Sequence, residues 1–76
     1  MTYIDLNDLV LSAMSKREKK VRFTVSQETV YTPTHDGKHY TYKHQYAIAV
    51  DGRKPITADT PEEAFTQFVR DEIANA

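Results

Sequence analysis

The sequence has no cysteine, only two glycines and three prolines, and almost no net charge. The lack of cysteine excludes disulfide bonds, zinc–thiolate sites and thiol catalysis. A composition of 39% hydrophobic and 28% charged residues is typical of a globular chain rather than a disordered one. Ten basic residues against eleven acidic ones leave a net charge of −1, so the bulk charge does not indicate a polyanionic partner.

Long hydrophobic runs are also lacking. No apolar stretch approaches the roughly 20 residues that a membrane-spanning helix needs. The acidic start of the chain has no apolar core of a secretory signal, so we expect a cytoplasmic protein with no membrane partner. A chain of 76 residues is too short for two hydrophobic cores, and we expect one domain over residues 1–76.

Two segments show the apolar spacing of an amphipathic helix. In the first, Asp5 or Asn7 is predicted to cap the start; in the second, Thr60 caps it, Pro61 occupies the first turn and Glu63 completes a capping box. The apolar positions recur every three or four residues, which predicts one buried face on each helix. They are Leu6, Leu9, Val10, Ala13 and Met14 in the first helix, and Ala64, Phe65, Phe68, Val69 and Ile73 in the second.

The middle of the chain predicts a β-hairpin. Apolar and polar residues alternate over 21–26 and again over 40–50, the period of a half-buried strand. Between them, Asp36-Gly37 is a preferred pair for a two-residue type I′ turn. A turn centred there pairs residues whose numbers add up to 73, which places Val25 opposite Ile48. Turn chemistry and hydrophobic pattern therefore predict the same register.

A third, short strand follows a second turn at Asp51-Gly52. A three-residue loop places Ile56 and Ala58 beside Ile48 and Tyr46, so that the apolar side chains share one face. Pro55 lacks the N–H group that an inner strand needs, which makes the third strand an edge.

The predicted fold is therefore α+β, with the element order α-β-β-β-α. The three strands form an antiparallel meander, and because only one sheet face is apolar, both helices should cover that face. Strands of this length span about 40 Å, whereas a compact chain of this size is about 30 Å across. We therefore expect the first hairpin to protrude.

The predicted register gathers aromatic and polar side chains at the end of the hairpin. Cross-strand tyrosine pairs stabilise an exposed ribbon, and tyrosine is also a typical anchor of protein interfaces. The hairpin end is therefore either a solvated ribbon or a docking surface. The candidate protein-binding residues are Tyr31, Pro33, Tyr40, Tyr42 and His44.

Candidate chemistry is sparse. His39 and His44 have opposite parity on one strand and point to opposite faces, so they cannot share a metal ion with His35 and Asp36 without a bulge. No serine has an evident histidine neighbour, and the acidic residues at 59–63 suit a helix start. We expect no metal site, no cofactor and no catalytic activity.

Positive charge concentrates in one segment. It can contact phosphates or an acidic protein surface, or it can be a solvated helix end. As a nucleic-acid-binding site it would comprise Lys16, Arg17, Lys19, Lys20 and Arg22, together with the hairpin.

The order α-β-β-β-α with both helices on one sheet face resembles the double-stranded-RNA-binding domain. Thr32-Pro33-Thr34-His35 is similar to the Gly-Pro-x-His loop with which that family enters the minor groove. The family also holds phosphates with lysines at the start of its second helix. This chain has Glu62 and Glu63 there, which repel phosphate, so the resemblance implies a shared fold and not a shared function.

Three hypotheses from different classes follow. The first is a small non-catalytic protein-binding module, of the regulator or inhibitor type, that uses the hairpin end, the open sheet face or the edge of the first strand. The second is a nucleic-acid-binding domain that uses the basic segment and the hairpin. The third is a homodimer that pairs first strands or stacks the sheet faces at Ala47 and Ala49. Another protein is the partner we favour.

Overall fold

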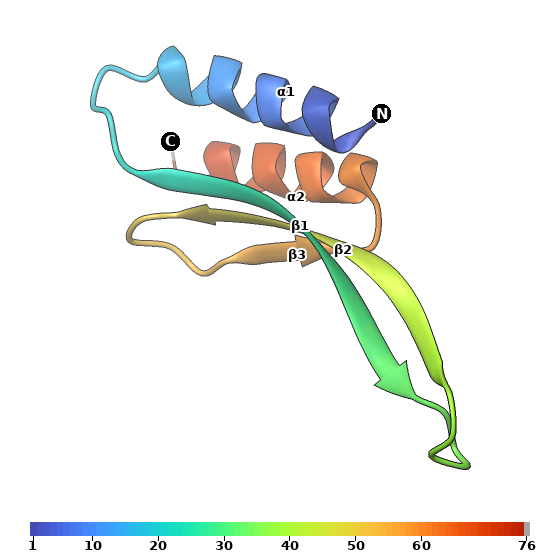
Figure 1. The fold of residues 1–76 in the computed structure, drawn as a ribbon. Helices are drawn as coiled ribbons and strands as arrows, with labels where there is room; N and C mark the ends of the chain where they lie inside the picture. Colours follow the sequence, from blue (N-terminus) through green and yellow to red (C-terminus); the bar gives the residue numbers. More distant parts are fainter. Residues whose placement is uncertain (76) are drawn as a thin grey trace.

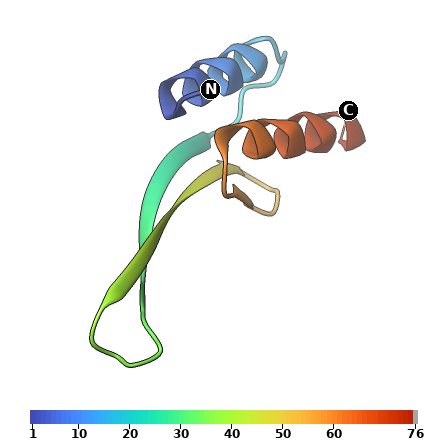
Figure 2. The same ribbon diagram turned by 90° about the vertical axis from the view of Figure 1, so that its right-hand side faces the viewer.

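The computed structural model describes residues 1–75 and shows the predicted α+β fold (Figure 1). The three strands form one antiparallel sheet in the order β1-β2-β3. Both helices lie over the same face of this sheet, as Figure 2 shows from the side. The elements are α1 (Tyr3–Ser15), β1 (Phe23–Pro33), β2 (Tyr40–Val50), β3 (Ile56–Ala58) and α2 (Pro61–Ala74).

Helix α1 begins earlier than the sequence pattern predicts. Thr2 is its N-cap: the Thr2 hydroxyl accepts a hydrogen bond from the Asp5 N–H at 3.2 Å, and the Asp5 carboxylate accepts one from the Thr2 N–H at 2.9 Å. The prediction that Asp5 or Asn7 caps the helix was wrong, because this reciprocal capping box satisfies two free N–H groups where a single cap satisfies one.

Helix α2 begins at the predicted position. The Thr60 hydroxyl accepts a hydrogen bond from the Glu63 N–H at 3.1 Å, and Pro61 follows as the first helical residue. Proline fits there because the missing N–H would have had no partner in the first turn.

The β1–β2 register is the predicted one, but the turn is of another type. Val25 pairs with Ile48, and in every other pair the two residue numbers also add up to 73. The Gly37 N–H donates to the Thr34 carbonyl at 2.9 Å, and among the described residues only glycines have positive φ, 72° at Gly37. A type I′ turn requires positive φ at Asp36 as well, so this prediction was wrong. The register survives because a four-residue loop, 35–38, has the same centre and parity as a two-residue loop.

Strand β3 also pairs as predicted, with Ile48 opposite Ile56 and Tyr46 opposite Ala58. The loop before it turns at Gly52, whose φ of 88° suits the third position of a type II turn. The Arg53 N–H donates to the Val50 carbonyl at 3.0 Å and closes this turn.

The two helices run in parallel. An ion pair at each end joins them: the Met1 amine lies 3.0 Å from the Glu62 carboxylate, and Arg17 Nε lies 3.8 Å from a Glu72 oxygen. Between them and the sheet lies a small core, in which α1, β2, β3 and α2 all bury side chains. Its buried members are Leu6, Val10, Met14, Ile48, Val50, Ala58, Ala64 and Phe68.

Three apolar residues predicted on the buried helix faces are exposed instead. Leu9 is 40% exposed, Val69 is 38% exposed and Ile73 is 72% exposed. A sheet of three strands is narrow and covers only the centre of the apolar face of each helix. Side chains at the margin of that face therefore remain in contact with solvent. The predicted apolar stripes were therefore too wide.

The hairpin gives the molecule an elongated shape. Its principal extents are 52 × 23 × 18 Å, and its radius of gyration is 14.7 Å, whereas a compact chain of this length has about 11 Å. Figure 1 shows that the half of β1 and β2 next to the hairpin loop extends beyond both helices. The predicted protrusion is confirmed.

Replacing the glycine of the hairpin loop tests its conformation. We expect Gly37→Ala to lower the free energy of unfolding by about 1 kcal/mol, because φ of 72° is strained for alanine while the added Cβ meets no atom within 4 Å. Gly37→Asn should lose less, since asparagine tolerates this region. Urea denaturation measures both; equal stability of Gly37→Ala and the wild type would contradict the strain.

Candidate binding surface on the hairpin

The predicted tyrosine cluster forms and is exposed. Tyr31 is 65% exposed, Tyr40 is 69% exposed and Tyr42 is 67% exposed. Tyr31 lies directly opposite Tyr42 in the register, and Pro33 lies opposite Tyr40. These residues belong to the half of β1 and β2 next to the hairpin loop, which extends away from both helices (Figure 2).

Contacts across and along the strands hold the rings of Tyr31, Tyr42 and His44. The centroids of Tyr31 and Tyr42 are 6.2 Å apart at an interplanar angle of 45°. Tyr42 also meets His44 edge-on, with ring centroids 6.0 Å apart, and His44 Nδ1 lies 3.2 Å from the Thr29 hydroxyl. Such aromatic pairs restrict the rotamers of each ring. We name Tyr31, Pro33, Tyr40, Tyr42 and His44 the aromatic face.

The loop at the end of the ribbon is internally bonded. The Thr34 hydroxyl donates to Asp36 Oδ1 at 2.5 Å, and Asp36 Oδ1 also accepts from the Lys38 N–H at 3.0 Å. The Thr34 N–H donates to the His39 carbonyl at 2.8 Å. The Thr34 hydroxyl, followed by the Lys38 amide, lowers the pKa of Asp36 below its ordinary value. This loop therefore positions the ends of both strands.

The basic segment has internal partners for two of its five cations. Lys20 Nζ donates to the Ser15 carbonyl at 2.6 Å and to the Arg17 carbonyl, and so satisfies free acceptors at the end of α1. Arg17 lies against Glu72 and Met14. The remaining three cations, Lys16, Lys19 and Arg22, are exposed. The segment thus lies at the end of α1 and in the connection to β1.

A second ionic contact involves Arg53, which the sequence did not single out. Its Nη1 lies 2.5 Å from Glu72 Oε1 and 3.1 Å from Asp71 Oδ2, and only 14% of its side chain is exposed. The hydrogen bond with Glu72 is the main reason why the pKa of Arg53 is raised. This contact ties the β2–β3 loop to α2.

Two acidic residues near the start of α2, Asp59 and Glu62, have structural partners as well. Glu62 binds the Met1 amine, which lowers the pKa of Glu62, and Asp59 lies 3.5 Å from Lys43.

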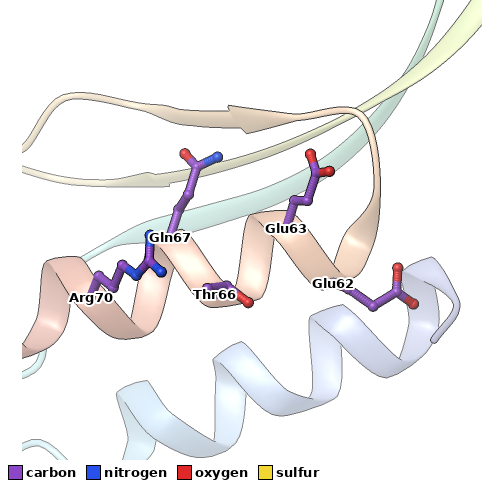
Figure 3. A pocket seen from close by; sticks show the side chains of 5 residues that line it. All are labelled: Glu62, Glu63, Thr66, Gln67 and Arg70. Atoms are coloured by element: carbon purple, nitrogen blue, oxygen red, sulfur yellow. The ribbon is translucent and has the colours of Figure 1, made fainter.

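A shallow depression of about 260 Å³ lies on the outer side of α2, between the side chains labelled in Figure 3. It is open to solvent, and Glu62, Glu63 and Arg70 on its rim belong to one helix. Within residues 1–75, no group of three metal-ligating side chains exists.

Sequence reasoning missed one exposed apolar pair. Ile4 is 69% exposed and Leu11 is 49% exposed, both on α1. Residues seven apart lie on the same side of a helix. The sequence alone could have indicated this exposed pair, because both residues are apolar and neither belongs to the predicted buried face.

Comparisons with known protein families, with curated proteins and with solved structures find no match to this chain. No helix within the described part of the chain is long and apolar enough to cross a membrane.

Stability should fall in acid. Hydrogen bonds from the Thr2 backbone and hydroxyl lower the pKa of Asp5, and those from Thr34 and Lys38 lower that of Asp36, each from an ordinary 3.8. A lowered folded-state pKa contributes stability above the ordinary value, which is lost as the pH falls through the folded-state value. We expect denaturation between pH 5 and pH 2 to be less pH-dependent in Asp36→Asn than in the wild type. Asp51→Asn, which removes an exposed carboxylate from the other loop, is the control; parallel curves for wild type and Asp36→Asn would contradict the assignment.

Removing Arg53 should destabilise the fold. Arg53→Met leaves Asp71 and Glu72 without their shared cation, and we expect a loss of about 1.5–3 kcal/mol. Lys54→Met changes the neighbouring, exposed cation and should stay within about 0.5 kcal/mol of the wild type. Chemical denaturation of both variants measures the difference; an equal effect would show that the ionic contact is not stabilising.

Proposed function

We propose that this protein is a small non-catalytic protein-binding module that docks its partner on the aromatic face of the hairpin. The observation that carries the proposal is the exposure of Tyr31, Tyr40 and Tyr42, each about two-thirds exposed, on a ribbon that extends beyond the core. The hydrophobic core does not include these tyrosines, and the cross-strand pair of Tyr31 and Tyr42 contributes at most about 1 kcal/mol to the hairpin. A binding role explains why bulky rings occupy these positions.

The chemistry of the aromatic face indicates what kind of partner it fits. Tyrosine combines a rigid apolar ring with a polar hydroxyl, so it loses little conformational entropy on binding and tolerates solvent when free. The face carries no acidic or lysine side chain; its one titratable ring besides the tyrosines is His44. A partner should therefore offer an apolar groove with hydrogen-bonding groups at its rim.

Two features favour this surface over the basic segment. Arg17 lies against Glu72, and Lys20 donates to the Ser15 carbonyl. The lysine of β2, Lys43, lies 3.5 Å from Asp59. A phosphate-binding surface needs several free cations, and these internal contacts reduce those of the basic segment from five to three, Lys16, Lys19 and Arg22. Glu62, at the start of α2, also presents negative charge where the RNA-binding family presents lysines.

Substitution of the rings tests the proposal. The triple variant Tyr31→Ser, Tyr40→Ser, Tyr42→Ser should lose at least tenfold in affinity for whatever protein the wild type captures, because each truncated anchor typically costs more than 1 kcal/mol. The measurement is affinity capture followed by mass spectrometry and titration of the protein retained. Circular dichroism confirms that the core is folded.

A matched control makes the result specific. Ile4→Ser, Leu11→Ser, Ile73→Ser removes three exposed apolar side chains from the helices and should leave capture unchanged. If the helix variant loses its partner while the tyrosine variant retains it, the docking surface lies on the helices and the proposal fails.

A further inference from the structure

Among residues 1–75, no strand pairs with the outer edge of β1. The Asp51 N–H donates to the Arg22 carbonyl and the Thr34 N–H to the His39 carbonyl, so even-numbered residues of β1 bond to β2. Odd-numbered residues therefore direct their N–H and carbonyl groups away from the sheet. The Tyr3 hydroxyl, which donates to the Val25 carbonyl at 2.9 Å, confirms this direction.

This edge is free in the half of β1 that is next to the hairpin loop, which we call the ribbon together with the part of β2 that pairs with it. Tyr3 of α1 closes the edge at Val25, whereas Gln27, Thr29 and Tyr31 lie beyond the helix and are all exposed. Proteins usually protect such an edge with a lysine, an internal proline or a bulge. Strand β1 has none of these: its pairing with β2 is continuous, its proline is the last residue, and its single charge is Glu28.

The ribbon itself lacks a third strand. Strand β3 pairs only with residues 46–48 of β2, so beyond that point two strands stand alone. A two-stranded ribbon is marginally stable in water, and a further strand with a shared face adds the stability it lacks. The same deficit exists in every copy of the chain, and one β1–β1 contact corrects it in two copies at once.

We infer that the free edge of β1 pairs with β1 of a second copy of this chain, antiparallel, with Thr29 opposite the second copy's Thr29. In this register Gln27 lies opposite the second copy's Tyr31, and every free N–H and carbonyl of the three odd residues finds a partner. Hydrogen-bonded pairs exchange two bonds each. The result is a four-stranded sheet, β2-β1-β1-β2, across a two-fold axis.

Each neighbouring register of the two β1 strands has a cost that the axis at Thr29 avoids. Shifting the axis to residue 28 places Glu28 opposite the second copy's Glu28, and like charges directly opposite destabilise a sheet. Shifting it to residue 30 places Gln27 opposite Pro33, which has no N–H to donate. Shifting it to residue 27 requires Val25, whose carbonyl already accepts a hydrogen bond from Tyr3. The axis at Thr29 avoids all three costs.

Substitutions at the axis test the pairing. Light scattering of the wild type should show twice the 8.8 kDa monomer mass, and Thr29→Lys should show the monomer, because it opposes two lysines. Thr29→Val removes the same hydroxyl and its contact with His44 without adding charge, and it should remain dimeric. Circular dichroism verifies the fold of both variants. A monomeric wild type at millimolar concentration, or a dimeric Thr29→Lys, overturns the inference.

The register is tested by cross-linking, which the lack of native cysteine makes unambiguous. Opposed Cα atoms in the proposed pairing lie about 5.5 Å apart, within the range of a disulfide. Thr29→Cys should therefore form a covalent dimer on mild oxidation, more than tenfold faster than Glu28→Cys or Val30→Cys. A faster reaction at either neighbouring position overturns the proposed axis. The outcome is independent of the hairpin's protein partner, because no partner is present.

Discussion

The pairing of β1 with β2 is the constraint on which the rest of the structure depends. Side chains alternate between the two faces of a strand, so a shift by one residue moves every apolar side chain to the other face. The observed register places Val25 and Ile48 beneath the helices and, further along the same face, Tyr31 beside Tyr42. One alignment therefore determines both the core and the exposed aromatic surface.

Most of the fold was predictable because independent signals agreed. The centre of the hairpin follows from Asp36-Gly37, and the hydrophobic alternation over 40–50 requires the same centre. The turn type was not predictable in this way, since loops of two and four residues share that centre. Only the φ values distinguish them, and the Thr34 hydroxyl, which binds both Asp36 and the backbone of His39, favours the longer loop.

The candidate surface was predictable where it depended on parity and unpredictable where it depended on long side chains. Tyr31 and Tyr42 met as the register required. Arg17, in contrast, looked free in the sequence because its partner, Glu72, lies 55 residues further along the chain. Arg53 showed no local pattern at all. Ion pairs between distant segments depend on how the helices are placed over the sheet, which local spacing does not describe.

The parallel orientation of α1 and α2 has a consequence for the distribution of charge. Parallel helices align their macrodipoles, so two partly positive N-termini lie side by side at one end and two partly negative C-termini at the other. Asp5 and Glu62 counter the first pair, while Arg17 and Arg53 bring cations to the second. Because the two helices point the same way, the compensating charges gather at opposite ends of the pair, acidic at one and basic at the other.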